Sequence, residues 1–279
     1  MTNILQRLLR LFLQPHKLPY KLFHKLENYV IRISLKKRIL VQHNNECIFT
    51  IRNFGFLTKY RASTFSSKEP ETIDWIDDFE RSDNLLDIGA NIGLYSLYAA
   101  SKGNNVRSLE PDALNFALLN LHILDNELEQ NIIAYPYAIN DKSAISLLNI
   151  QNYQWGGANS SFGRAVNWEG KGNFQKKFIQ GSPGITIDEF VEASDFKPNH
   201  IKIDIDGNEL LALIGAKQTL EDKNLKTILI ELYEENPEYK RCLEIIEKSG
   251  LVLKNKFHPL EESHSNKMPK NHIFSKKHV

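Results

Sequence analysis

Cysteine is nearly absent from this sequence of 279 residues. Its two cysteines, Cys47 and Cys242, lie far apart, and neither has another cysteine close by. This usage excludes a disulfide framework and a zinc site built on cysteine pairs, because both need several thiols at suitable spacings. Isolated cysteines of this kind are typical of a protein that works in a reducing compartment.

Long apolar runs are also missing. No stretch reaches the roughly 18 consecutive apolar residues that a membrane-spanning helix needs. The apolar start, residues 1–13, is interrupted by Arg7 and Arg10 and lacks the small-residue cleavage site of a secretion signal. We therefore expect a cytoplasmic protein.

The sequence has no strong excess of one charge, since its formal net charge is +1. A general polyanion binder is therefore not expected, but residues 1–40 carry nine basic side chains and only one acid, Glu27. Their start predicts a short basic amphipathic helix. Three interpretations stay open: peripheral contact with an anionic inner membrane, packing on the main domain or a second subunit, and an organelle presequence.

The most informative stretch is Leu85–Gly93, which reads Leu-Leu-Asp-Ile-Gly-Ala-Asn-Ile-Gly. An apolar run ends at Asp87, a turn holds Gly89 and Gly93, and an amphipathic segment follows. A second apolar run closes on Glu110. Strand, glycine turn, helix, strand and acid form the skeleton of a nucleotide-binding βαβ unit, in which the distal acid accepts hydrogen bonds from ribose hydroxyls.

The spacing argues against a dinucleotide. Counted from Gly89, Asn91 and Leu94 stand where a dinucleotide fingerprint has its second and third glycines, and no phosphate-loop lysine follows. Asp87 would repel a pyrophosphate but suits a ligand with an ammonium group and no phosphates. S-adenosylmethionine is such a ligand, and we expect it as the cofactor.

Between about Thr72 and Lys276 the chain resembles the FkbM family of S-adenosylmethionine-dependent methyltransferases. The resemblance is carried by Asp87-Ile-Gly-Ala-Asn-Ile-Gly-Leu-Tyr-Ser96, Glu110-Pro111, Asn115-Phe116 and Ile201-Lys-Ile-Asp-Ile-Asp-Gly-Asn-Glu209. It implies a Rossmann-like, seven-stranded class I methyltransferase fold and O-methylation of a hydroxyl on a sugar, a glycan or a natural product. The acceptor is then a small molecule or a glycan.

The periodicity of the sequence predicts an α/β domain over residues 71–279, preceded by a basic arm and small cap over residues 1–70. The alternation predicts a mostly parallel sheet with helices on both faces and a C-terminal antiparallel hairpin. In the cap, we expect a hairpin over residues 46–61 with its turn at Phe54-Gly55. The expected strands are 84–88, 105–110, 132–137, 201–205, 226–232, 251–257 and 271–275; the expected helices are 92–101, 112–126, 208–221 and 237–249.

Residues 138–185 interrupt this alternation. They contain a predicted strand, Ile145–Ile150, and a polar, glycine-rich stretch from Trp155 to Arg164. A long insertion near the carboxyl edge of an open α/β sheet lies where ligands bind. We expect it to recruit the acceptor, and a merely flexible loop is the alternative.

The cofactor site is expected at the ends of the first three core strands. Asp87 would face the amino group of the cofactor, and Glu110 would accept both ribose hydroxyls. The other expected contacts come from the glycine turn and from the strands that follow it, with Asp204 beside the sulfonium: Gly89, Ala90, Asn91, Gly93, Pro111, Asn140 and Asp204.

The catalytic groups are expected in and after the fourth core strand. An unbroken strand would place Lys202, Asp204 and Asp206 on one side, an unfavourable arrangement of charges unless they are used. Asp204 is our first choice for the base that accepts the hydroxyl proton, with Lys202 and Glu209 in support. Glu231 is the alternative base, whereas Asp206 and Glu209 would equally well cap the next helix.

A divalent metal on Asp204, Asp206 and Glu231 is conceivable, but nothing fixes three ligands, so we predict no metal site. Two other functions are weighed against sugar methylation. One is methylation of nucleic acid through the basic arm, which the sequence disfavours because no aromatic clamp for a flipped base follows Asp204. The other is a membrane-associated, cofactor-binding scaffold without turnover. The oligomeric state is not predicted.

Overall fold

The structure is a computed structural model that describes residues 25, 28, 37–172, 175–257 and 268–276. Most of the basic arm therefore lies outside the described residues, and its predicted helix and membrane contact stay predictions. Within the described ranges, no helix combines the length and apolar character needed to cross a membrane.

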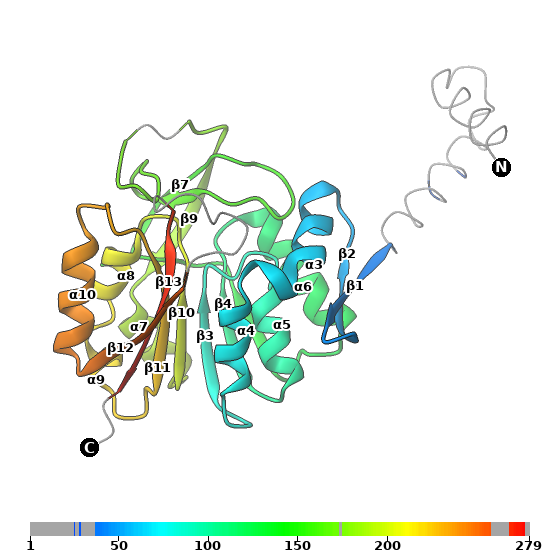
Figure 1. Ribbon diagram of the computed structural model, residues 1–279. Helices are drawn as coiled ribbons and strands as arrows, with labels where there is room; N and C mark the ends of the chain where they lie inside the picture. The colour runs from blue at the N-terminus through cyan, green and yellow to red at the C-terminus, as the bar shows by residue number, and fades with distance from the viewer. Residues whose placement is uncertain (1–24, 26–27, 29–36, 173–174, 258–267, 277–279) are drawn as a thin grey trace.

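A seven-stranded sheet forms the centre of the protein (Figure 1). Its order is β12-β13-β11-β10-β3-β4-β5, and β3, β4, β5, β10 and β11 run parallel. β13 is antiparallel to both of its neighbours, β11 and β12. This confirms the predicted class I methyltransferase fold with its C-terminal hairpin. The strands are β3 (Asn84–Ile88), β4 (Asn105–Leu109), β5 (Ile132–Tyr135), β10 (His200–Ile203), β11 (Thr227–Leu232), β12 (Leu251–Phe257) and β13 (Lys270–Lys276).

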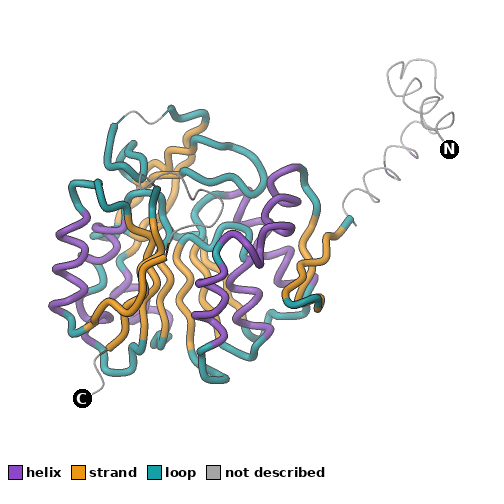
Figure 2. The backbone as a smooth tube through the Cα atoms, in the orientation of Figure 1, coloured by secondary structure: helices purple, strands orange, loops and turns teal. Residues whose placement is uncertain are grey.

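Helices cover both faces of the sheet, as Figure 2 shows. Within β3, Leu85 belongs to one buried apolar cluster and Leu86 and Ile88 to the other, which is the alternation of a strand buried on both sides. The expected helix over 208–221 is split in two by Gly215 and Ala216, and the helix at 187–194 was not predicted. The helices are α3 (Phe56–Lys68), α4 (Pro70–Asp77), α5 (Leu94–Ser101), α6 (Ala113–Asp125), α7 (Ile187–Ser194), α8 (Glu209–Ile214), α9 (Lys217–Glu221) and α10 (Tyr239–Lys248).

The hairpin in the cap was predicted at the wrong position in the sequence. It consists of β1 (Arg38–His43) and β2 (Glu46–Arg52), and the residues expected to form its second strand belong to helix α3. The turn is Asn44-Asn45, with φ of 50° and 65°. Asparagine tolerates this left-handed conformation, which tight hairpin turns require.

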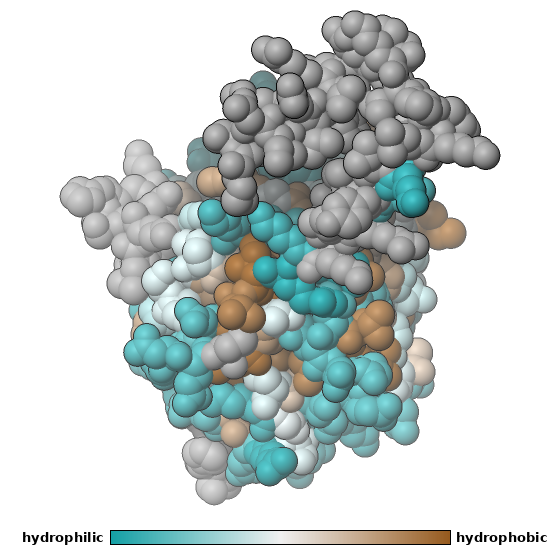
Figure 3. All heavy atoms as spheres, turned by 90° about the vertical axis from the view of Figure 1, so that its right-hand side faces the viewer, coloured by the Kyte–Doolittle hydropathy of each residue, from teal (hydrophilic) through white to brown (hydrophobic). Residues whose placement is uncertain are grey.

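Figure 3 views the molecule from the side of this hairpin and shows apolar patches between hydrophilic side chains. Leu40 of β1, Phe56 at the start of α3 and Leu124 near the end of α6 stay exposed. The opposite side of the hairpin is buried, because Val41 and Ile51 belong to the same core cluster as the helices beside it.

The insertion forms a small sheet of its own above the carboxyl edge of the central sheet (Figure 1). The predicted strand over 145–150 is confirmed, and the remaining three strands were not predicted. The order is β6-β9-β7-β8, with β6 (Ala138–Ile139), β7 (Ala144–Ile150), β8 (Ser160–Phe162) and β9 (Phe178–Ile185). Its small core consists of Ala138, Leu148, Ile150 and Phe162.

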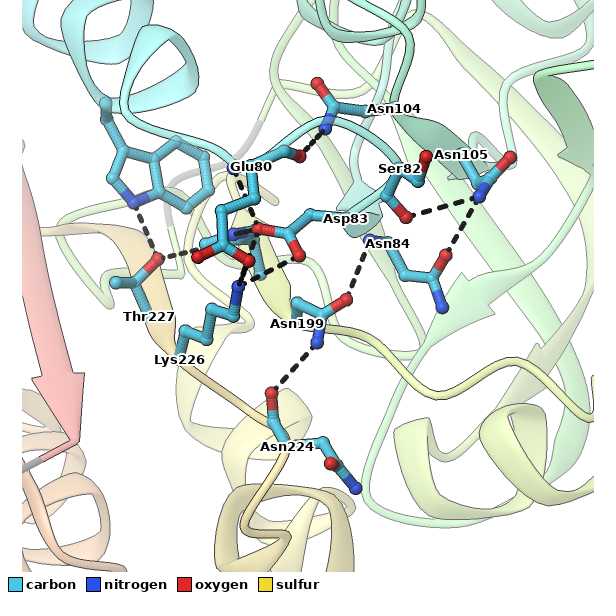
Figure 4. Close-up of polar contacts among 12 residues, drawn as sticks. Glu80, Ser82, Asp83, Asn84, Asn104, Asn105, Asn199, Asn224, Lys226 and Thr227 are labelled. Carbon is cyan, nitrogen blue, oxygen red and sulfur yellow. Dashed lines mark hydrogen bonds and ion pairs between the residues drawn. The ribbon is translucent and has the colours of Figure 1, made fainter.

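A polar network joins the amino ends of β3, β10 and β11 to α4, at the edge opposite the insertion (Figure 4). Asp83 Oδ2 lies 3.0 Å from His200 Nε2, and Lys226 Nζ lies 3.0 Å from both Asp83 oxygens. Thr227 Oγ1 bonds to His200 Nδ1 at 2.7 Å and accepts a hydrogen bond from Trp75 Nε1 at 2.8 Å. Burial lowers the pKa of His200 to about 4, so the ring is neutral at physiological pH.

Candidate active site

Two adjoining cavities of about 270 and 210 Å³ open at the carboxyl edge of the central sheet. They share lining residues and form one cleft, whose floor is the glycine turn after β3. Part of its wall comes from α3. The shared residues are Arg61, Lys68, Gly89, Asn91, Ala158 and Asp204. Ligands bind at this edge in open α/β sheets.

At Gly89 the chain that leaves β3 passes close to the chain that leaves β10. Its φ is +79°, and a Cβ atom there would lie 1.9 Å from the carbonyl oxygen of Asp204. Only glycine fits, and the neighbour that excludes a side chain here is the chain after β10. Gly93 lines neither cavity, and its missing Cβ instead makes room for Leu119 of α6.

Asp87 is almost completely buried and lines the smaller cavity. Its Oδ2 accepts a hydrogen bond from Ser96 Oγ at 2.5 Å, whereas its Oδ1 is buried without any hydrogen-bond partner. Burial raises the pKa of this carboxyl above its usual value. A buried carboxylate oxygen without a donor is the group that the ammonium of S-adenosylmethionine would satisfy, so the site fits this cofactor. Ala90 lines the same cavity.

Glu110 follows β4 and lines the larger cavity. Its two oxygens accept hydrogen bonds from the backbone nitrogens of Asn91 and Asp112, both at 2.8 Å. Burial outweighs these bonds and raises the pKa of Glu110 to about 8. The Glu110 carboxyl therefore lies in the cleft, as expected for a residue that holds a ribose. Its raised pKa, however, could not be predicted from the sequence.

The residues beyond Glu110 only partly match the prediction for the adenine end. Pro111 lines the larger cavity, together with Tyr137 and Ala138. Asn140 lines neither cavity, because its backbone nitrogen donates to the carbonyl oxygen of Ile185 in the small sheet. The structure therefore does not bring Asn140 to the cleft.

Lys202 and Asp204 form an ion pair at the base of the cleft. Strand β10 ends at Ile203, and Lys202 Nζ lies 2.9 Å from Asp204 Oδ2. Lys202 is 2% exposed and Asp204 33%. Burial lowers the pKa of Lys202, but the charges of Asp204, Asp87 and Glu69 outweigh it and raise the pKa above its usual value. Lys202 is therefore a fixed positive charge.

The condition for Lys202, Asp204 and Asp206 to share one side, an unbroken strand, is not met, because β10 ends at Ile203. Asp206 has a φ of 54°, and its Oδ2 accepts hydrogen bonds from the backbone nitrogens of Asn159 (2.7 Å) and Ser160 (3.3 Å). Glu209 lines neither cavity and accepts from the backbone nitrogens of Ile205 and Gly207. Asp206 therefore holds the insertion, and Glu209 shapes the turn before α8.

Two asparagines also hold the insertion from below. Asn91 Nδ2 donates to the carbonyl oxygen of Gly157 at 2.6 Å, and Asn115 Nδ2 donates to the same oxygen at 3.0 Å. Asn115 Oδ1 accepts from the backbone nitrogen of Gly156 at 2.9 Å. We call these bonds and those of Asp206 the clasp. The clasp fixes residues 156–160 above the glycine turn.

Glu231, near the end of β11, lines the larger cavity beside Trp168 of the insertion. Removal from water and the negative charges of Asp204 and Glu69 raise the pKa of Glu231 well above its usual value. Trp168 packs edge-on against Tyr233, with ring centroids 4.8 Å apart. This part of the cleft therefore combines the aromatic ring of Trp168 with the carboxyl groups of Asp204 and Glu231.

Sequence reasoning missed the residues that α3 and the residue after it supply. Arg61 and Lys68 of α3 line both cavities, and Glu69 lines the smaller one. Burial alone would raise the pKa of Glu69, but the neighbouring Lys68 and Lys202 lower it to about 2. The helical spacing of Leu57, Arg61, Thr64 and Lys68 is the signal that could have revealed this face. Among the described residues, no group of three or more His, Cys, Asp or Glu is placed to hold a metal ion.

Part of the chain matches a known family. Residues 87–253 match the methyltransferase FkbM domain, which is more than half of the chain. The chain is also 26% identical, over 159 residues, to the hexuronic acid methyltransferase AglP of Haloferax volcanii. This alignment covers 57% of the chain and 59% of AglP, so the chain spans less than two thirds of that relative.

Solved structures give more distant matches. Fibrillarin from Aeropyrum pernix, bound to S-adenosyl-L-methionine, has a TM-score of 0.46 at 12% identity and covers 86% of this chain and 83% of its own. An rRNA methylase from Streptococcus thermophilus has a TM-score of 0.46 at 11% identity and covers 74% of this chain and 94% of its own. These scores are too low to bear on function. On the strength of the matched domain, the chain belongs to the FkbM family of S-adenosylmethionine-dependent methyltransferases.

Proposed function

We propose that this protein methylates a hydroxyl group of a sugar, free or within a glycan, using S-adenosylmethionine. The observation that carries this proposal is that Asp204 and Glu231, which follow or end adjacent strands, line one cavity with the aromatic ring of Trp168. Sugars offer hydroxyls to carboxylates and C–H faces to aromatic rings. The similarity to a hexuronic acid methyltransferase supports the same class of acceptor.

The cleft offers a separate group for each part of the cofactor. Asp87 would hold the ammonium, the backbone at Gly89 and Ala90 would approach the methionyl chain, and Glu110 would accept the ribose hydroxyls. Pro111 and Ala138 would border the adenine. When bound, the cofactor supplies a methyl group on a sulfonium, so attack by the acceptor oxygen forms an O–C bond and breaks an S–C bond.

The residues of the chain must orient the acceptor and remove its proton. Asp204 is the base that we favour, because it lines both cavities and forms an ion pair with Lys202 at 2.9 Å. Glu231 is the alternative base: its raised proton affinity suits proton acceptance, but it must first be ionised. In both cases the hydroxyl proton moves to a carboxylate oxygen as the new O–C bond forms. A positioned base of this kind contributes typically 10²–10⁴-fold.

Methyl transfer to defined acceptors tests the proposal. The protein is incubated with cofactor carrying a deuterated methyl group and with uronic acid glycosides, neutral glycosides or oligonucleotides, and products are identified by mass spectrometry. We expect a labelled sugar ether, together with a turnover at least 100-fold lower in one of Asp204→Asn and Glu231→Gln. Binding of S-adenosylhomocysteine without labelling of any sugar would exclude sugar methylation. Labelling of the oligonucleotides alone would favour a nucleic-acid acceptor.

A further inference from the structure

Helix α3 presents one face to the smaller cavity. Leu57, Arg61, Thr64 and Lys68 follow each other at intervals of three and four residues, and all four line this cavity. The helix lies N-terminal to residues 87–253, which match the family domain, so the match itself says nothing about what this face does.

The charges of the smaller cavity are almost all paired. Three cations line the cleft within the described part of the chain, namely Arg61, Lys68 and Lys202. Lys68 pairs with Glu69 at 3.0 Å and Lys202 with Asp204 at 2.9 Å. Arg61 has no carboxylate of the described residues within ion-pair distance, and its charge acts on Asp206 of the larger cavity only from farther away.

The guanidinium of Arg61 is only partly used. Its Nε donates to the carbonyl oxygen of Gly156 at 2.9 Å, and no described residue accepts from its two terminal nitrogens. A guanidinium prefers planar, two-oxygen acceptors, and a carboxylate matches two of its N–H groups at once. In the smaller cavity, the two terminal nitrogens of Arg61 therefore have N–H groups without an acceptor among the described residues.

Asp87 lines the same cavity and has an unpartnered buried oxygen. The cavity thus holds an unsatisfied carboxylate oxygen and an unpaired guanidinium. An α-amino acid carries the complementary groups, an ammonium and a carboxylate on one carbon atom. Glu110 lines only the larger cavity, which leaves the smaller one for the amino-acid end of a nucleoside cofactor.

We propose that Arg61 of α3 binds the carboxylate of the methionyl part of S-adenosylmethionine, opposite Asp87. This assignment rests on the proposed function. It makes α3 part of the cofactor site, although the helix lies outside the residues that match the family domain. Through Gly156, the same side chain connects the cofactor carboxylate to the insertion.

Calorimetry with two ligands tests this assignment. S-adenosylhomocysteine carries the carboxylate, and its decarboxylated form keeps the adenosine, thioether and amine. Both are titrated into the wild type, Arg61→Met, Arg61→Lys and the control Arg81→Met, which replaces an exposed arginine. Circular dichroism and thermal unfolding check the fold of each variant.

The wild type and Arg81→Met should bind S-adenosylhomocysteine about 10- to 100-fold more tightly than the decarboxylated form, as expected for a charge-assisted hydrogen bond. In Arg61→Met this preference should disappear while binding of the decarboxylated form is retained, and Arg61→Lys should keep part of it. Equal weakening of both ligands in Arg61→Met would mean that Arg61 only holds the insertion, which overturns the assignment alone. Binding of neither ligand to the wild type would overturn the proposed function as well.

Discussion

Asn91 Nδ2 lies 2.6 Å from the carbonyl oxygen of Gly157, so a side chain of the glycine turn after β3 bonds directly to the insertion. The backbone nitrogen of the same residue donates to Glu110 Oε2 at 2.8 Å. Asn91 therefore links the group proposed to hold the ribose with the segment above it. A substitution that displaces Glu110 should therefore also displace the insertion, and the reverse should hold as well.

Replacing Asn91 with aspartate should loosen the insertion. Aspartate tolerates the φ of 52° at this position but cannot donate to Gly157, and its charge repels the carbonyl oxygen. We expect faster hydrogen exchange at residues 156–160 and a loss of about 1–3 kcal/mol of local stability. Asn120→Asp on the exposed side of α6 is the matched control. Unchanged exchange in the Asn91 variant would contradict the role given to the clasp.

Cofactor affinity should depend on the ionisation of Glu110. Its pKa of about 8 means that the free carboxyl is protonated at neutral pH, whereas ribose hydroxyls are held best by the carboxylate. Affinity for S-adenosylhomocysteine should therefore rise by up to tenfold per pH unit until about pH 8 and then level off. Glu110→Gln should bind more weakly and lack this rise in calorimetry between pH 6 and 9. The same rise in both proteins would assign it to another group.

The two candidate bases should differ in their effect on stability. Asp204→Asn removes the ion-pair partner of buried Lys202, so we expect the free energy of unfolding to fall by about 1–3 kcal/mol. Glu231→Gln breaks no ion pair among the described residues and removes a buried carboxyl whose ionisation is disfavoured near Glu69 and Asp204, so the free energy of unfolding should stay equal or rise. Urea unfolding measures both. Strong destabilisation by Glu231→Gln would show that its carboxyl has a structural partner.

Gly89→Ala should abolish cofactor binding. The added Cβ would lie 1.9 Å from the carbonyl oxygen of Asp204, so β3 and β10 would have to separate. Gly250→Ala is the matched control, because its φ of +84° is similar and no atom lies within 4 Å of the added Cβ. The control should keep cofactor binding in calorimetry, and its free energy of unfolding should fall by only about 1–2 kcal/mol through backbone strain. Similar losses in both variants would mean that the close approach of Asp204 is tolerated.

The network in Figure 4 should make the protein sensitive to mild acid. His200 has a folded pKa of about 4 against an ordinary value of 6.5. The folded state therefore binds fewer protons than the unfolded state between these values, and stability falls as the pH falls through this window, by about 3 kcal/mol from this ring. The pKa of Asp83 is also lowered, but this carboxyl acts below its ordinary value of 3.8, outside the window. His200→Gln should show a shallower decline of melting temperature between pH 6.5 and 4, and an identical decline would assign it to other groups.

The core strands were predictable because local pattern and burial agree there. Runs such as Leu85-Leu86 end in an acid and a glycine, and the sheet they form is buried on both faces. Helix α3 was missed for the opposite reason. Its sequence has weak helical propensity, because it contains Thr58, Ser63, Thr64 and Ser66. The helix is stabilised instead by packing against β1 and β2.

The candidate site was only half predictable. Asp87, Gly89 and Glu110 stand at fixed spacings within one βαβ unit, which is why the sequence places them correctly at the cleft. The contacts of Asp206, by contrast, depend on where residues 159 and 160 return to the sheet. No local pattern encodes such a contact over more than 40 residues of chain, whereas the helical spacing around Arg61 becomes informative only once α3 is known to be a helix.

The clasp reaches the insertion only through main-chain atoms. Asn91, Asn115 and Asp206 bond to backbone nitrogens and oxygens of residues 156–160 and to none of their side chains. Gly157 is restricted because a Cβ there would meet the carbonyl oxygen of Asn152 at 2.1 Å, and Gly156 and Asn159 are restricted by φ values of 77° and 64°. At residues 158 and 160, which line the larger cavity, side chains can be exchanged while the segment keeps its position, so the upper wall of the cleft can change without any change in the glycine turn below it.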